Sequence, residues 1–246
     1  MLSLKGVTIN FNALRSSIAL ALFACVSLAS AESAGKFDRT YAPQGAARLT
    51  ISNFNGTIHV TGWDKKTISV RANADPAVVI QDEVVGDDIA IRVKRDFRLR
   101  RSDFEVFAPP DTSITLRSFM GDIEVNGVAG HVSINSIDSN VRLVGLNSPS
   151  VDVKVTSGDV YFDGRLHDGG SYNLQSIKGD IDVTLPGSTS FNLNARALSE
   201  NINLGAFLNS LTSSTRGAKG VSGTYLNGNS RLTLTAFAGR ILLHKK

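Results

Sequence analysis

The strongest constraint on the fold is an eight-residue phrase that occurs five times at nearly even spacing between Ser118 and Leu204. Its centres, counted at Gly121 and the equivalent positions after it, are 18, 19, 21 and 21 residues apart. A period of about 20 residues is typical of a solenoid or strand array. The copies are SFMGDIEV (Ser118–Val125), SIDSNVRL (Ser136–Leu143), VTSGDVYF (Val155–Phe162), SIKGDIDV (Ser176–Val183) and ALSENINL (Ala197–Leu204), with outlying copies NFNGTIHV (Asn53–Val60) and AFAGRILL (Ala236–Leu243).

The hydrophobic pattern of each copy predicts a strand. In the first copy Ile123 and Val125 share one parity and Glu124 separates them. This two-residue period belongs to a half-buried strand, because a helix would repeat every 3.6 residues. A second alternating run lies between successive copies, so each period predicts two short strands joined by two corners. These runs are Val132–Ile134, Val151–Val155, Tyr172–Leu174 and Phe191–Ala195.

The middle of each phrase predicts a tight corner. Glycine adopts backbone conformations that other residues adopt only at a cost. Ser139 and Glu200 replace it in two copies, where we expect less tight corners. We also predict that the residue two positions before each centre points inward and stacks on its equivalent in the next coil. These residues are Phe54, Phe119, Ile137, Thr156, Ile177, Leu198 and Phe237.

The repeats predict an all-β, single-domain β-solenoid, similar to a β-helix, with two short strands per coil of about 20 residues. One coil buries too little apolar surface to offset the entropy of ordering it, so neighbouring coils must stabilise each other. The alternative is a pair of packed antiparallel sheets with the same alternation. The solenoid requires one shared buried column of Ile123, Val141, Val160, Ile181 and Ile202.

The first 31 residues have the features of a secretory signal. Lys5 and Arg15 precede an apolar core at Ile18–Leu28, and Ala29–Ala31 forms a small-x-small cleavage site. Cleavage would leave 24 basic and 22 acidic residues, a formal charge of +2, and no cysteine. The sequence therefore predicts export to the periplasm, the cell surface or the medium, without a transmembrane span in the mature chain. Lipid attachment at Cys25 is the less favoured alternative, because Phe23 fits the processing site poorly.

The remaining chain divides into a polar leader over residues 32–48 and the repeat domain over 49–246. Residues 77–107 are less regular, and a turn at Gly86–Asp88 followed by alternating Ile89–Val93 predicts a hairpin that projects or caps the N-terminal end. Residues 205–229 predict an irregular coil or a loop. The final phrase is expected to close the fold, with Lys245–Lys246 discouraging end-to-end pairing.

The order of several segments resembles the bacterial "putative adhesin" family of secreted β-strand-repeat proteins, a domain of unknown function. The resemblance covers about residues 48 to 246, and it implies an exported, β-helix-like fold without known catalytic residues. This chain departs from the pattern at Ser139 and Glu200. The segments that carry the resemblance are Phe104–Pro110, Ile114–Leu116, Ser118–Val125, Leu185–Gly187, Gly220–Gly228 and Leu232–Leu243.

Two charged features suggest ligands, each with a simpler interpretation. Asp122, Asp159 and Asp180 share one corner position and could form a Ca²⁺ ladder. We favour turn residues that bond their own backbone, because Asn140 and Asn201 interrupt the row. The five basic residues of Lys94–Arg101 could contact phosphates of lipopolysaccharide, a membrane or nucleic acid. We favour a solvated hairpin edge and predict no nucleic-acid partner.

The residues that would face outward on successive phrases are mixed in character, as expected of a binding face rather than a catalytic one. An ion pair is expected between Glu124 and Arg142. Trp63 and Tyr161 are candidate sugar platforms, whereas the parity of Tyr172 places it in the core. The outward residues are His59, Glu124, Arg142, Tyr161, Asp182, Asn203 and Leu242.

No pattern in the sequence marks a catalytic, cofactor or metal site. His59, His131, His167 and His244 are scattered without metal-ligand spacing, and no nucleophile motif or phosphate-binding loop occurs. We therefore predict a non-catalytic envelope or cell-surface adhesion or scaffold module, with an envelope glycan, lipid or protein surface as partner. The alternatives are a carbohydrate-active enzyme on a β-helix and a periplasmic accessory protein that binds anionic lipids or glycans. A cleft with two close carboxylates would favour the enzyme.

Overall fold

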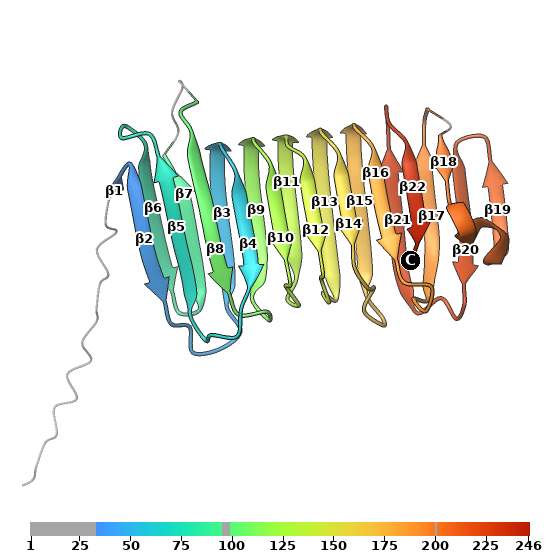
Figure 1. Ribbon diagram of the computed structural model, residues 1–246, viewed down its shortest axis with the longest axis horizontal. Coiled ribbons are helices and arrows are strands. Elements are labelled where there is room, and N and C mark those ends of the chain that lie inside the picture. The colour runs from blue at the N-terminus through green and yellow to red at the C-terminus, as the bar shows by residue number, and fades with distance from the viewer. Residues whose placement is uncertain (1–32, 95–98, 200) are drawn as a thin grey trace, which may run out of the picture.

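The computed structural model describes residues 33–94, 99–199 and 201–246. They form two long sheets of short strands, which lie face to face and share one apolar core. Figure 1 shows the strands side by side along the longest axis, with β2 at one end and β19 at the other. The proposed signal segment and Cys25 lie outside the described residues. Within the described part, no helix has the length and apolar character needed to cross a bilayer.

One strand of each sheet and the two corners that join them make a coil. In spatial order, the twelve-stranded sheet contains β1 (Ser33–Ala34), β6 (Val79–Val85), β7 (Asp88–Val93), β3 (Arg48–Asn55), β9 (Ser113–Met120), β11 (Val132–Asp138), β13 (Ser150–Ser157), β15 (Ser171–Lys178), β21 (Ser230–Ala236), β17 (Phe191–Ala197), β20 (Gly220–Tyr225) and β19 (Leu211–Gly217). The ten-stranded sheet contains β18 (Ile202–Asn203), β22 (Ile241–Lys245), β16 (Ile181–Leu185), β14 (Val160–Asp163), β12 (Val141–Val144), β10 (Ile123–Asn126), β4 (Ile58–Gly62), β8 (Ser102–Ala108), β5 (Ile68–Ala74) and β2 (Lys36–Tyr41). Within the described ranges, the one helical element is a 3₁₀ turn, η1 (Gly205–Ser210).

The predicted β-solenoid is confirmed. Strands of neighbouring coils pair in parallel and in register, so that Ile123 pairs with Val141, and Val160 with Ile181. These four side chains are at most 1% exposed and form one continuous column. The fifth expected member, Ile202, is only partly buried, and Ile241 separates it from Ile181, so the expectation is wrong for this residue. Among the described strands, antiparallel pairing, the basis of the alternative, occurs only near the ends, at β1–β6–β7, β2–β5–β8 and β17–β20–β19.

The stacking order of the coils differs from the chain order at the C-terminal end. Ile241 of the last coil pairs with both Ile181 and Ile202, so β21 and β22 lie between two coils that precede them. The expectation that the final phrase closes the fold is therefore wrong. The antiparallel hairpin β19–β20 instead lies at this end of the twelve-stranded sheet, followed inward by β17. The terminal lysines do not protect an end: Lys245 lies near Tyr225, and Lys246 pairs with Asp163.

The prediction that the residues two positions before each corner point inward is wrong except at Phe54, which is partly buried against the core. Alternation along the strand decides their direction: Leu116 and Ser118 face the core in β9, and Phe119 therefore faces out. The same parity leaves five large apolar residues exposed: Phe119, Ile137, Ile177, Leu198 and Phe237. The residue before each of them is small and buried, at the inner side of the corner: Ser118, Ser136, Ser176, Ala197 and Ala236.

The loss of glycine at Ser139 does not loosen its corner. The Ser139 amide donates to the Ser157 carbonyl oxygen at 2.9 Å, within the 2.8–3.2 Å of the equivalent bonds from Gly56, Gly121 and Gly158. The Ser139 hydroxyl is buried and bonds the Ser136 hydroxyl. The expectation of a less tight corner is wrong at Ser139, and Glu200 lies outside the described residues.

The irregular N-terminal part caps the solenoid. The predicted hairpin is β6–β7, in which β7 also pairs in parallel with β3. Residues 32–48, assigned above as a leader, contain β2, which forms the edge of the ten-stranded sheet and buries Phe37. The segment Lys94–Arg101 lies between β7 and β8 in the chain, and its residues 95–98 lie outside the described residues.

Candidate binding face

The outer face of the ten-stranded sheet presents one continuous row of aligned side chains. The strands pair in register, so residues from distant parts of the chain become neighbours: Asp38 pairs with Arg71, and Arg71 with Glu105. The predicted outward residues all lie in this row, and strands β2, β5 and β8 extend it. In spatial order the row consists of Asp38, Arg71, Glu105, His59, Glu124, Arg142, Tyr161, Asp182, Leu242 and Asn203.

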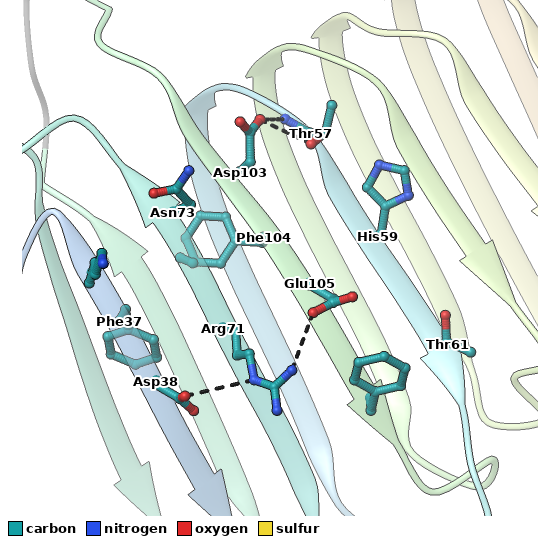
Figure 2. Close-up of a pocket in the computed structure, with 13 residues that line it drawn as sticks. Phe37, Asp38, Thr57, His59, Thr61, Arg71, Asn73, Asp103, Phe104 and Glu105 are labelled. Atoms are coloured by element: carbon teal, nitrogen blue, oxygen red, sulfur yellow. Dashed lines mark hydrogen bonds and ion pairs between the residues drawn. The ribbon is translucent and has the colours of Figure 1, made fainter.

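A groove of about 680 Å³ lies where β2, β5, β8 and β4 meet (Figure 2). This volume is within the range of small-molecule sites. Buried Phe37 and Phe104 form its apolar floor, and Phe107 lines one end. The polar part of its lining comes from the outward row and from neighbouring residues. The polar and charged lining residues are Lys36, Asp38, Thr57, His59, Thr61, Arg71, Asn73, Asp103 and Glu105.

Arg71 lies between two carboxylates at the centre of the groove. Its Nε is 3.7 Å from Asp38 Oδ2, and its NH1 is 3.6 Å from Glu105 Oε2 (Figure 2). All three side chains are more than half exposed. These distances leave polar atoms of the guanidinium and both carboxylates available to water or a ligand. The arrangement therefore offers donors and acceptors together on an open surface.

Asp103 fixes one rim of the groove. Its Oδ1 accepts hydrogen bonds from the Thr57 amide at 2.8 Å and the Thr57 hydroxyl at 3.0 Å, and its Oδ2 accepts from Arg101 at 2.7 Å. Burial opposes ionisation, but the bonds from Arg101 and Thr57 outweigh it and lower the pKa of Asp103 below its ordinary value. Asp103 is therefore a charged, positioned rim residue at neutral pH.

The aromatic residues divide between platform and core. Phe107 lines the groove and stacks on Trp63, with ring centroids 5.3 Å apart. The Trp63 ring also lies under the Lys65 ammonium at 4.6 Å, and its Nε1 donates to Thr67. Phe107 therefore lines the groove, whereas Trp63, the predicted platform, does not. Tyr172 is in the core as predicted, 1% exposed.

The expected ion pair between Glu124 and Arg142 does not form, although the two residues are in register. Glu124 Oε2 lies 3.4 Å from His59 Nδ1, and the Arg142 guanidinium lies 4.3 Å from the centre of the Tyr161 ring. Each side chain turns to its other neighbour along the row. Tyr161, a candidate sugar platform, is consequently partly covered by Arg142.

The corner aspartates serve the backbone of the next coil. Asp159 Oδ1 accepts from the Asp180 amide at 2.8 Å, and Asp180 Oδ1 accepts from the Arg240 amide at 2.7 Å. Asn140 continues the series: its Oδ1 accepts from the Asp159 amide and its Nδ2 donates to Asp122. The expectation of bonds to their own backbone is corrected, because these bonds join coils. Among the described residues, no group of three or more His, Cys, Asp or Glu could hold a metal ion.

The histidines and the arginines of the basic segment do not come together in one site. His59 and His244 each lie 3.4 Å from a carboxylate of the outward row, whereas His131 and His167 are exposed elsewhere. In the basic segment, Arg100 lies 3.6 Å from Asp75, and Arg101 pairs with Asp103. These arginines are thus engaged in ion pairs within the protein.

The central residues of the groove were not identified from the sequence. Asp38 was placed in the leader, and Arg71 and Glu105 lie on strands outside the regular phrases. Strands β2 and β5 join the sheet through antiparallel pairing, which no repeat encodes. The alternation of apolar and polar residues around Arg71 indicates which face of the strand is exposed. It does not indicate which strand lies beside it.

Comparisons with known proteins give a family and a fold. The family model described as Toastrack DUF4097 matches residues 48–243. A comparison with curated proteins finds no match. A solved structure described as a putative cell adhesion protein from Clostridium sporogenes is similar at a TM-score of 0.53 and 14% identity, covering 87% of this chain and 100% of that one. A putative adhesin from Bacteroides fragilis has a TM-score of 0.42 and 14% identity, covering 86% and 97%.

Proposed function

Because the chain belongs to the Toastrack DUF4097 family, we propose that it is an exported, non-catalytic binding module of the cell envelope, with an adhesion or scaffold role. The membership confirms the family resemblance of the sequence. The structure from Clostridium sporogenes, described as a putative cell adhesion protein, has the same kind of fold and supports the adhesion role. A rigid solenoid suits this role, since its parallel ladders hold one long face in fixed register.

The ligand of this module is an envelope glycan, and it binds in the groove around Arg71. The observation that carries this assignment is the guanidinium between Asp38 and Glu105, in a groove that the Phe107 ring also lines. Sugars present hydroxyl groups at their edges and C–H groups on their faces. Adjacent donors and acceptors match the hydroxyls, and an aromatic side chain matches the apolar face.

The same groove supports binding better than hydrolysis. A glycosidase acid must hold its proton until it protonates the leaving oxygen. Asp38 and Glu105 are 73% and 57% exposed, and both lie beside a guanidinium. Both carboxyl groups therefore lie on an open surface beside Arg71, an arrangement that suits hydrogen bonding to a bound ligand. Carbohydrate cleavage remains the second candidate, because two carboxylates do flank one groove.

Export is supported by the charge and hydropathy of the first 31 residues. Lys5 and Arg15 precede the apolar segment Ile18–Leu28, as in secretory signals. The mass of the exported product tests this assignment. Cleavage after Ala31 gives a free N-terminus at Glu32, whereas processing at Cys25 gives a lipid-modified chain, and an intact Met1 contradicts export by this signal.

A matched pair of arginine variants tests the groove. Binding of defined envelope oligosaccharides is measured by calorimetry for the wild-type chain, Arg71→Met and Arg92→Met. Arg92 is equally exposed and ion-paired, with side-chain exposures of 59% and 60% for Arg92 and Arg71, but it lies on the other sheet. We expect Arg71→Met to weaken binding roughly tenfold or more and Arg92→Met to leave it unchanged.

Two results would contradict the proposal. Equal binding by both variants would show that the groove is not the binding site. Absence of saccharide binding by the wild-type chain would show that the ligand is not a glycan. Release of reducing ends that is lost in Asp38→Asn or Glu105→Gln would instead establish the enzyme.

A further inference from the structure

A second pocket, of about 500 Å³, lies between corner loops of the solenoid. Its walls come from the connections β12–β13, β14–β15 and β16–β17, along the lower edge of the molecule in Figure 1. The volume falls within the range of small-molecule sites. We call it the loop pocket, and it shares no residue with the groove around Arg71. Its polar lining includes Asn147, Arg165, His167, Asp168, Ser188 and Thr189.

The inserted position of the last coil explains why the loops separate here. Strands β13 and β15 are neighbours, so the connections that lead into them run side by side. Strand β17 is not the neighbour of β15, because β21 lies between the two. The β16–β17 loop must therefore reach one strand further than the β14–β15 loop. The two loops diverge, and the loop pocket is the space between them.

Hydrogen bonds of the backbone hold both walls. The Gly169 amide donates to the Asn229 carbonyl oxygen at 3.1 Å, and the Ser230 amide donates to the Ser190 carbonyl oxygen at 3.2 Å. The Ser230 hydroxyl donates to the His167 carbonyl oxygen at 2.9 Å. The short segment before β21 thus binds the β14–β15 loop and the β16–β17 loop together. The pocket is preformed, which lowers the entropic cost of binding a ligand.

The side chains of the pocket, in contrast to its backbone, are available for a ligand. Arg165 and Asp168 are exposed, and among the described residues neither the guanidinium nor the carboxylate has a partner. Thr189 is 4% exposed, and its hydroxyl has no partner in the described part of the chain. A buried hydroxyl without a hydrogen bond lowers stability, and a ligand that supplies the bond offsets this cost.

We propose that the loop pocket binds a sugar acid, a sugar ring that carries one carboxylate and several hydroxyl groups. The Arg165 guanidinium binds the carboxylate, because its planar donors match the two carboxylate oxygens. Asp168 accepts hydrogen bonds from sugar hydroxyls. Asn147 and Ser188 supply both donors and acceptors for the remaining hydroxyls.

The charges of the pocket favour this ligand over other small polar molecules. Asp168 would repel inorganic phosphate, whose negative charge is larger than that of a single carboxylate. A neutral sugar would leave Arg165 without an anionic partner. A zwitterionic amino acid could pair with both charges, but it has too few hydroxyl groups to use Asn147, Ser188 and Thr189 as well. A sugar acid uses all of these side chains.

NMR titration of the full chain with D-glucuronate, D-glucose and L-serine tests the class of ligand. We expect glucuronate to bind roughly tenfold or more tightly than the other two, because only it combines a carboxylate with a hydroxylated ring. Arg165→Gln should reduce the affinity for glucuronate to that for glucose. The control is Arg117→Gln, which removes an exposed arginine of β9 outside the pocket and should bind glucuronate as the wild type does.

A second matched pair of variants tests the buried hydroxyl. Thr112 and Thr189 occupy similar turns, since each amide donates at 3.0 Å to the carbonyl oxygen of the proline three positions earlier. Both hydroxyls are buried without a partner among the described residues, but Thr112 does not line the loop pocket. We expect Thr189→Val to weaken glucuronate binding roughly threefold or more and Thr112→Val to leave it unchanged. Neither variant should lower the midpoint of denaturant unfolding, because neither loses a hydrogen bond within the protein.

Three results would overturn the proposal. Glucose or serine that binds as tightly as glucuronate would exclude a sugar acid as the preferred ligand. Unchanged glucuronate binding in Arg165→Gln, or in Thr189→Val, would show that the ligand does not occupy the loop pocket. The proposal does not rest on the groove: Arg71→Met should bind glucuronate as the wild type does, so each site can fail without the other.

Discussion

Asp180 Oδ1 accepts a hydrogen bond from the amide of Arg240 at 2.7 Å, although 60 residues separate them in the chain. The Arg240 guanidinium returns to the same carboxylate, with NH2 2.6 Å from Oδ2. The contact joins the last coil to the coil of β15 and β16. It shows that the corner acids connect coils, and that the last coil is inserted beside a much earlier one.

This contact predicts an acid-dependent contribution to stability. The hydrogen bonds from the Arg240 guanidinium and amide lower the pKa of Asp180 below its ordinary value. A lowered pKa in the folded state stabilises the protein above the unfolded pKa of about 3.9, and this stabilisation is lost as the pH falls through the folded pKa. Asp180→Asn keeps an acceptor but removes the charge. We expect it to cost about 1 kcal/mol near neutral pH, because Arg240 is exposed and water screens the pair.

Denaturant unfolding of both proteins as a function of pH measures this contribution. The free-energy difference between wild type and Asp180→Asn should shrink below pH ~4, where the wild-type carboxylate also gains a proton. A difference that stays constant down to the acid limit would show that the charge of Asp180 does not contribute.

The sequence predicted the regular coils because local alternation and periodicity encode them. Ile123, Val141, Val160 and Ile181 form four of the five places of the predicted column, since each is inward by parity within its own short strand. Ile202, the fifth, is only partly buried. Alternation along β9 also determines the direction of the Phe119 side chain, which faces out. The expectation that Phe119 points inward was based on its place before the corner and not on this alternation. The small residue before it already fills the interior of the corner.

The order of coils and the groove could not be predicted in the same way. Nothing local in Ile241 specifies that it pairs between Ile181 and Ile202, because all seven phrases offer similar edges. The groove depends on Arg71 lying beside Asp38 and Glu105, and antiparallel pairing between non-repeated strands brings them together. Such pairing is a property of the whole chain, whereas the phrases are properties of eight residues.

Glycine at the corner is required by the approach of the neighbouring coil. A Cβ on Gly179, which has a φ of +152°, would overlap the carbonyl oxygen of Gly158. Gly169 also has a positive φ, +76°, but a Cβ there meets nothing within 4 Å. We expect Gly179→Ala to cost about 3 kcal/mol or more and Gly169→Ala about 1 kcal/mol, measured by chemical unfolding. Equal costs would mean that backbone conformation alone selects glycine.

Two isoleucines of one strand should respond differently to truncation. Ile134 is 1% exposed in the core and Ile137 is 46% exposed before the corner, both on β11. We expect Ile134→Ala to cost about 2–5 kcal/mol, and Ile137→Ala no more than about 0.5 kcal/mol. Thermal or denaturant unfolding compares them. A large loss in Ile137→Ala would indicate that the residue packs inward as the corner pattern alone suggested.

Tyr41 should make stability decline in alkali. Burial, followed by the hydrogen bond to Asp82, raises the pKa of Tyr41 well above its ordinary value, and the phenol lies 2.8 Å from Asp82 Oδ2. A raised folded pKa stabilises the protein below the unfolded pKa of about 10, and this stabilisation is lost as the pH rises further. We expect wild type to lose more stability than Tyr41→Phe above pH ~10. Parallel slopes for the two proteins would refute this.

The inserted position of the last coil predicts which amides exchange slowly. In chain order β21 belongs to the final coil, where a solenoid that stacks sequentially would fray. In space it lies between β15 and β17, and Leu234 is fully buried. Strand β19 is the edge of the same sheet, with most of its residues exposed. Exchange from an interior strand requires a larger opening than exchange from an edge. Hydrogen–deuterium exchange should therefore find residues 230–236 as protected as 171–178 and far slower than 211–217. Rapid exchange at 230–236 would place the last coil at the end of the stack and contradict the inserted topology.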